Sequence, residues 1–165
     1  MKKIQFVIVA LLLAVLSSCK PTPKEAGEFN DSLMEQQKAV VIMYDKLLET
    51  FDTYVPAKMD EAYIALADQL TKSRANVQDI IPIEGGEPLK QEVLNYLSVI
   101  EDATSNDLEY LVRVYKLPEP EFTSEVRLQW DARYKDVDTR IKDAAKQLKA
   151  VQAVFAENFN LKIAK

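Results

Sequence analysis

The stretch VRLQWDARYKDVDTRIKDAAKQLKAVQAVFAENF, residues 126–159, contains no proline or glycine over its whole length. Its apolar residues recur at steps of three and four, which places them on one face of an α-helix, because the helix turns once every 3.6 residues. A helix with one apolar face buries that face against other elements. The stretch therefore predicts a long helix, from about residue 123 to 160, packed on further helices. The residues of its apolar face are Val126, Trp130, Tyr134, Val137, Ile141, Ala144, Leu148, Val151, Phe155 and Phe159.

Three earlier segments of the chain repeat this spacing, and each predicts a helix. Their apolar positions run from Leu33 to Tyr54, from Met59 to Ile80 and from Leu89 to Tyr115. The pattern Ser32-x-x-Glu35 predicts a capping box near the start of the first helix. No stretch of alternating apolar and polar residues predicts a strand. At 1.5 Å per residue, the fourth helix would be about 57 Å long and the first about 35 Å, so we expect the fourth to bend or overhang.

Short breaks rich in proline and glycine separate the four predicted helices. The first break carries Pro56, the second is "IPIEGGEP" at residues 81–88, and the third is "LPEPEF" at residues 117–122. Short connections favour antiparallel neighbours, so the sequence predicts an all-α fold, an up-down-up-down antiparallel four-helix bundle with a long C-terminal helix. Residues 84–125 carry ten acids and three bases, and residues 126–165 carry nine bases and five acids, which favours pairing of the third and fourth helices.

The chain opens with "MKKIQFVIVALLLAVLSSCK", in which two lysines precede an apolar run from Ile4 to Leu16. This layout is typical of a secretory signal peptide, and the run is shorter than the roughly 20 residues that span a bilayer. It ends in Leu16-Ser17-Ser18-Cys19, an order that resembles the lipobox of bacterial lipoproteins. The resemblance implies cleavage before Cys19, a diacylglycerol thioether on its thiol and a further N-acyl chain such as palmitate. Cys19 is the only cysteine, which excludes a disulfide.

These features divide the chain into three parts. We predict a lipoprotein signal peptide at residues 1–18, a lipidated cysteine with a flexible tether at residues 19–28, and a four-helix bundle domain at residues 29–165. Pro21 and Pro23 favour an extended tether, at about 3.1 Å per residue. Acylated Cys19 would then hold the protein on a lipid bilayer of the bacterial cell envelope. Within the family it resembles, a lysine after the cysteine is compatible with the outer membrane, and the periplasmic and surface faces both stay open.

Composition argues against several classes of function. Histidine is absent from all 165 residues, which removes the commonest general base and nitrogen ligand. Three glycines are too few for a phosphate-binding loop, and a formal net charge of −5 disfavours nucleic acid as a partner. We expect no enzymatic activity, no cofactor and no metal site. Four oxygen-bearing residues do gather in the third helix, but a straight helix rarely wraps a cation; they are Glu101, Asp102, Asn106 and Asp107.

One end of the predicted bundle gathers apolar loop residues. In an up-down path, the tether, the loop at 81–88 and the C-terminus share the end that faces the membrane, and the other two connections share the far end. An apolar patch with an acidic rim is typical of a protein-contact site. The alternative is that these residues only close the top of the core. The predicted contact residues are Tyr54, Val55, Tyr115, Leu117 and Phe122, with Glu119 and Glu121 at the rim.

The C-terminal end carries apolar residues beside lysines, in the stretch "VFAENFNLKIAK" at residues 154–165. We predict that it either packs on Ile81 and Ile83 or touches the bilayer surface.

Length, lipobox and helical layout together resemble the small all-helical surface lipoproteins of unknown function from Bacteroidota and spirochaetes, with a likeness around "YDKLLETFDTYV" at residues 44–55. Two functions follow as hypotheses. The first is a membrane-anchored envelope lipoprotein that acts as a non-enzymatic helical protein-interaction module with an envelope protein as partner. The alternative is a bundle lipoprotein that binds a small apolar or lipid ligand.

Overall fold

A computed structural model describes residues 20–162, so the predicted signal peptide and Cys19 lie outside the described residues. Within that range every regular element is helical and no strand occurs, which confirms the all-α prediction with four helices. The third of these helices is continuous from α4 through a π-helical turn, η1, to α5, and we call these three elements together the third rod. The elements are α2 (Pro23–Thr53), α3 (Pro56–Asp79), the third rod made of α4 (Glu87–Ala103), η1 (Thr104–Leu108) and α5 (Glu109–Tyr115), and α6 (Ser124–Asn158).

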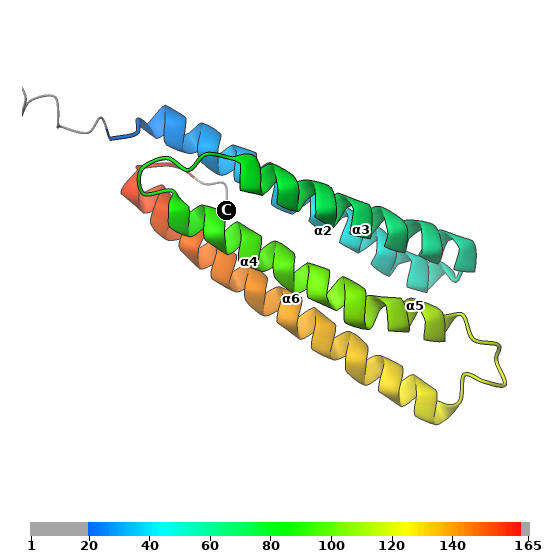
Figure 1. Cartoon of the computed structure of the whole chain (residues 1–165). Helices are drawn as coiled ribbons and strands as arrows, with labels where there is room; N and C mark the ends of the chain where they lie inside the picture. The colour runs from blue at the N-terminus through cyan, green and yellow to red at the C-terminus, as the bar shows by residue number, and fades with distance from the viewer. Residues whose placement is uncertain (1–19, 163–165) are drawn as a thin grey trace, which may run out of the picture.

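The four helices lie side by side along a common direction (Figure 1). α2 packs along α3, and α4 packs along α6, as the opposite charges of the third and fourth segments predict. The α3–α4 connection lies near residue 20, where the described chain begins, and the α2–α3 and α5–α6 connections lie at the opposite end (Figure 1). We call that opposite end, formed by residues 54–55 and 116–123, the distal end.

Helix α2 begins earlier than the sequence predicts. The extended tether expected for residues 20–28 is wrong from Pro23 onward, and so is the capping box at Ser32. Thr22 is the N-cap: its Oγ1 accepts a hydrogen bond from the Glu25 backbone N–H at 3.2 Å. Glu25 Oε2 in turn accepts one from the Thr22 N–H at 2.7 Å, and this bond lowers the pKa of Glu25. Pro23 therefore starts a helix, because proline suits the first helical position, where no N–H partner exists.

The earlier start also removes most of the predicted difference in helix length. α2 has 31 residues and α6 has 35, which correspond to about 46 Å and about 52 Å. The two helices therefore differ by only four residues, and α6 needs no large overhang.

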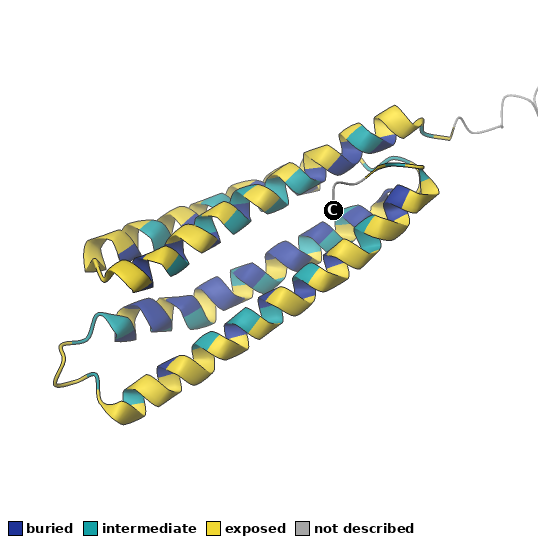
Figure 2. Cartoon of the chain, turned by 180° about the vertical axis from the view of Figure 1, so that it is seen from behind, coloured by how far each residue is buried: buried dark blue, intermediate teal, exposed yellow. Residues whose placement is uncertain are grey.

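The buried residues lie on the facing sides of the helices, and the exposed residues lie on the outer sides (Figure 2). Leu33 of α2, Leu66 of α3 and Leu97 of α4 are fully buried, as is Val137 of α6. Burying each such side chain contributes roughly 1.5–3 kcal/mol. Several aromatic residues on the apolar faces of the helices are also buried, whereas Tyr63 is half-buried; the buried ones are Tyr44, Phe51, Trp130 and Phe155.

The end of α6 packs near the start of the described chain. The ring centroids of Phe155 and Phe159 lie 4.7 Å apart, and a side chain at Gly85 would meet the Phe159 ring at 3.4 Å. One of the two predicted positions for this end was packing on the α3–α4 connection. In the structure the end does pack there, with Phe159 beside Gly85. Ile83 is half-buried, whereas Ile81 stays 85% exposed, so contact with Ile81 was a wrong expectation.

Alanine at two glycines should have opposite effects on stability. At Gly86 a Cβ would lie 2.8 Å from the ring of buried Phe29, so Gly86→Ala should lower the free energy of unfolding by about 1–2 kcal/mol. Gly27 lies inside α2, where a Cβ meets only Leu161 at 4.0 Å, so Gly27→Ala should raise it by about 0.5–1 kcal/mol. Urea unfolding followed by circular dichroism measures both. Equal stability of the two variants would contradict the close approach of Phe29.

Candidate functional site

Aromatic side chains from three of the four helices meet at the distal end. Tyr115, the last residue of α5, lies at their centre, with its ring centroid 5.2 Å from that of Phe51 and 5.2 Å from that of Trp130. The Tyr54 ring lies 5.7 Å away and the Phe122 ring 6.1 Å away. The Tyr115 hydroxyl donates to the Phe51 carbonyl at 2.9 Å. That carbonyl lies in the last turn of α2, where it has no partner within the helix, so the bond ties α5 to the end of α2.

Trp130 brings α6 into this aromatic cluster. Its ring meets Phe51 edge to face at 5.4 Å and stacks on Tyr134 at 5.3 Å with an interplanar angle of 6°. Its Nε1–H donates to the Leu111 carbonyl at 2.9 Å. Trp130 is 9% exposed, so an unbonded indole N–H there would carry a desolvation cost. The single indole therefore links α2, α5 and α6.

The structure brings three of the five predicted contact residues into ring contact, namely Tyr54, Tyr115 and Phe122. Val55 is the 38% exposed N-cap of α3, and Leu117 is half-buried against the core; neither joins the ring contacts. Three residues of the site could not be recognised from the sequence, because their spacing places them only on the apolar faces of the helices. These are Phe51, Trp130 and Tyr134.

A groove of about 770 Å³ lies beside the aromatic cluster, between α2 and α6. The buried and half-buried residues that line the groove form an apolar floor, and the exposed lining residues form a charged rim. The predicted acidic residues Glu119 and Glu121 do not line it. The floor consists of Leu48, Phe51, Tyr115, Phe122, Trp130 and Tyr134, and the rim of Asp45, Glu49, Asp52, Arg127 and Asp131.

The rim is acidic because of the spacing on α2. Asp45, Glu49 and Asp52 fall at positions i, i+4 and i+7, which share one face of a helix. Like charges at such spacing repel by a few tenths of a kcal/mol per pair, roughly 0.2–0.5. No ion pair within residues 20–162 reaches these three carboxylates or Asp131. With four carboxylates against Arg127 alone, the rim carries a net charge of −3.

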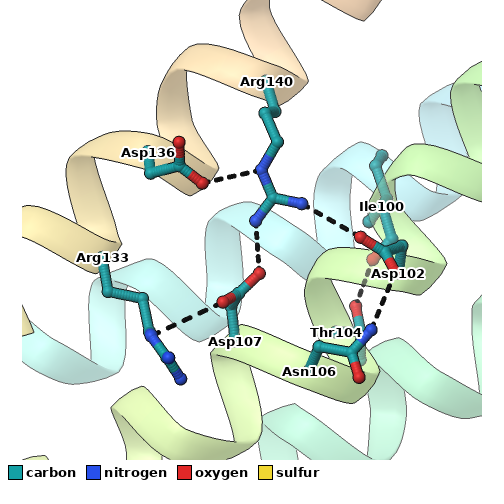
Figure 3. Close-up of polar contacts among 8 residues, drawn as sticks. All are labelled: Ile100, Asp102, Thr104, Asn106, Asp107, Arg133, Asp136 and Arg140. Atoms are coloured by element: carbon teal, nitrogen blue, oxygen red, sulfur yellow. Dashed lines mark hydrogen bonds and ion pairs between the residues drawn. The ribbon is translucent and has the colours of Figure 1, made fainter.

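A second cluster of polar side chains lies beside η1 (Figure 3). Arg140 of α6 makes ion pairs with Asp102 at 3.0 Å, with Asp136 at 2.9 Å and with Asp107. Arg133 adds a contact to Asp107 at 3.6 Å. Asp107 is 15% exposed, and its hydrogen bond raises the pKa of the Arg140 guanidinium. The network joins the third rod to α6.

Side-chain hydrogen bonds accompany the irregular backbone of η1. The buried Thr104 hydroxyl donates to the Ile100 carbonyl at 2.7 Å, and the Tyr63 hydroxyl of α3 donates to the Thr104 carbonyl at 3.4 Å. The Asn106 amide donates to Asp102 Oδ1 at 2.7 Å. π-helical turns often mark functional sites. Here the nearby carboxylates already have arginine partners, so we interpret η1 as a structural feature.

The acidic residues singled out in the third helix are thus engaged by bases from neighbouring helices. Glu101 pairs with Arg74 of α3, and Asp102 and Asp107 pair with Arg140. In the part of the chain that the structure describes, no group of three or more carboxylates is arranged to hold a metal ion.

One buried tyrosine has no hydrogen-bond partner. Among the described residues, the Tyr44 hydroxyl is the one buried side-chain polar atom without such a partner. Burial and the nearby Tyr134 and Asp138 raise the pKa of Tyr44 above its ordinary value. The phenol therefore stays protonated at neutral pH and is unsuited to act as a base.

The fold and its distal end define a class: an all-α protein of four long helices with an acid-rimmed aromatic groove. Comparisons with protein-family models, with curated proteins and with solved structures found no match for this chain. None of the helices within residues 20–162 combines the length and the apolar character that crossing a bilayer requires.

Proposed function

We propose that this protein is a lipid-anchored lipoprotein of the bacterial envelope that acts as a non-enzymatic helical module and binds another protein at its distal end. Acylated Cys19 would hold it on the outer membrane. Support for the anchor comes from the order Leu16-Ser17-Ser18-Cys19 after an apolar run. Two or three acyl chains anchor a protein stably, whereas a single chain binds only marginally.

The observation that carries the proposed contact is the groove with its aromatic floor at the distal end. This end lies away from residue 20 (Figure 1), so a partner could reach it without contacting the bilayer. Tyrosine, tryptophan and phenylalanine are enriched in protein interfaces. The alternative that these residues only close the core has less support, because Tyr54 is 53% exposed.

The backbone at Tyr54 adds a second argument. Tyr54 caps α2 in the left-handed conformation, with φ 44°, which glycine or asparagine usually adopts at this position. Such strain costs of order 1 kcal/mol or more and is concentrated at functional positions. A tyrosine here presents a large ring at the surface, which glycine would not do.

We further propose that the four helices form an antiparallel up-down-up-down bundle. This arrangement is supported by contacts between α2 and α6 at both ends. The Gln152 amide donates to Asn30 Oδ1 at 2.9 Å at one end, and Phe51 meets Trp130 at the other. The bundle would place the start of α2 and the distal groove at opposite ends.

The alternative function, binding of a small apolar or lipid ligand, is supported only by the size of the groove, since ligand sites commonly measure roughly 300–1,000 Å³. The core itself is filled by fully buried residues such as Leu47, Leu97 and Leu111. An apolar ligand in the groove would lie among four carboxylates, and desolvating charged groups is costly.

A photo-cross-linking experiment tests the proposed contact. Benzoylphenylalanine at position 54 of the full chain, produced in its own bacterium, should give a discrete cross-linked protein species. The same residue at the exposed position 68 in the middle of α3 should not. Phe122→Ala should weaken the species formed from position 54. Cys19→Ser should move the protein from the membrane fraction to the soluble fraction. Absence of a species specific to position 54 would refute the contact.

A further inference from the structure

We propose that the groove between α2 and α6 accepts a basic side chain, arginine or lysine, carried by an exposed segment of the partner protein. This inference rests on the proposed function, because it names the chemistry of the partner at the same end of the molecule.

The rim carboxylates differ from those that join the packed elements through ion pairs. Between helices elsewhere, Glu101 pairs with Arg74, Asp102 with Arg140 and Asp60 with Lys116. At the rim, by contrast, Asp45, Glu49, Asp52 and Asp131 have no ion pair within the described residues. A rim with a net charge of −3, whose four carboxylates make no ion pair within residues 20–162, is complementary to a cationic partner and would speed its approach.

The floor suits a guanidinium or ammonium group in particular. Aromatic rings attract cations over their faces, tryptophan most strongly, and arginine also stacks on them through its planar group. The protein already uses this contact elsewhere, because the Arg133 guanidinium lies 4.3 Å from the centroid of the Tyr110 ring. In the groove, five aromatic side chains lie between carboxylates of α2 and α6. A basic side chain could bury its aliphatic stem on the rings while its charge meets the rim.

The length of the acidic face favours a peptide segment over a single ion. Asp45 and Asp52 are seven residues apart on α2, which corresponds to about 10 Å along the helix axis. Carboxylates spread over this distance cannot all contact one metal ion, whose oxygen ligands lie at roughly 2–2.6 Å. They can contact the basic side chains of an extended segment, which rises about 3.3 Å per residue.

Fluorescence of Trp130 provides a direct test, because it is the only tryptophan of the chain and lies in the groove. The full chain in a non-ionic detergent is titrated with the peptide acetyl-GRGGRG-amide, and in parallel with the glutamate peptide acetyl-GEGGEG-amide and with spermidine. We expect a saturable change with the arginine peptide, and affinity for the glutamate peptide at least about tenfold lower. Raising the salt concentration from about 50 to about 500 mM should weaken the binding of the arginine peptide.

A charge-matched pair of variants separates the groove from overall charge. Glu49→Gln with Asp52→Asn removes two carboxylates of the rim, and Glu61→Gln with Asp68→Asn removes two exposed carboxylates of α3. The first variant should bind the arginine peptide about tenfold more weakly, and the second should stay within about twofold of the wild type. Equal losses in both variants, or no saturable change with the arginine peptide, would overturn the proposal. Binding of spermidine alone would do the same, because the groove would then be a site for small cations.

The two proposals fail in different ways. A cross-linked species at position 54 without binding of the arginine peptide would leave the protein contact in place and reject its basic chemistry. Peptide binding in the groove without any cross-linked species would support the cation-accepting groove and reject the envelope partner proposed for this end.

Discussion

Replacing Trp130 with alanine should lower the free energy of unfolding by about 3–5 kcal/mol. The indole is 9% exposed and contacts the rings of Phe51, Tyr115 and Tyr134, so the substitution would leave a large cavity where α2, α5 and α6 meet. It would also remove the hydrogen bond to the Leu111 carbonyl. Urea unfolding of the full chain in detergent, followed by circular dichroism, measures the effect.

Two controls separate the contributions of Trp130. Trp130→Phe keeps an aromatic ring but loses the N–H donor, so it should cost about 1–3 kcal/mol. Leu128→Ala removes an apolar side chain that is 70% exposed on the same helix, and it should change stability by about 0.5 kcal/mol or less. If Trp130→Ala cost no more than Leu128→Ala, the aromatic cluster would not hold the distal end together.

The second large effect is expected at Arg140. Arg140→Met should lower the free energy of unfolding by about 2–3 kcal/mol, because three carboxylates lose their partner. Asp107 is the main source of the loss, since it is 15% exposed and would keep only the 3.6 Å contact to Arg133. The loss should stay below that of a fully buried pair, because the Arg140 side chain is 34% exposed.

The Arg140 network is best measured by a double-mutant cycle with Asp107→Asn. We expect a coupling energy of about 1–2 kcal/mol between the two positions. Arg140→Lys should recover little of the stability lost in Arg140→Met, because a single ammonium group cannot reproduce the planar guanidinium that reaches three carboxylates. Lys142→Met, which removes an exposed pair within α6, should leave stability unchanged. Strict additivity in the cycle would mean that the network does not join the helices.

Local sequence features predicted most of the fold. The periodic apolar residues placed four helices, and prolines and glycines placed their connections within a few residues. The main difference lies at the start of α2, where Pro21 and Pro23 favour an extended tether but the chain is helical from Pro23 onward. Thr22 and Glu25 carried the contrary signal of a capping box, with proline at the first helical position.

The candidate site was predicted only in part. Residues in the two distal connections are close to each other in any path that reverses at each loop, so Tyr54, Tyr115 and Phe122 could be grouped from the sequence. The groove rim could not, because it depends on which face of α2 lies opposite which face of α6. Periodicity defines the faces of each helix but not the angle or spacing at which two helices pack.

The sequence by itself determined that this chain forms four helices, where three of them end, and which residues form their apolar faces; it also carries the lipobox-like order at Cys19. Only the tertiary structure decided that Arg140 joins Asp107 across 33 residues, that η1 interrupts the third rod, and that four carboxylates with no ion pair in the described part of the chain line the rim of an aromatic groove. The physical reason is range: helix formation and capping depend on neighbours within about four residues. Ion pairs and grooves arise only when packing brings distant helix faces together.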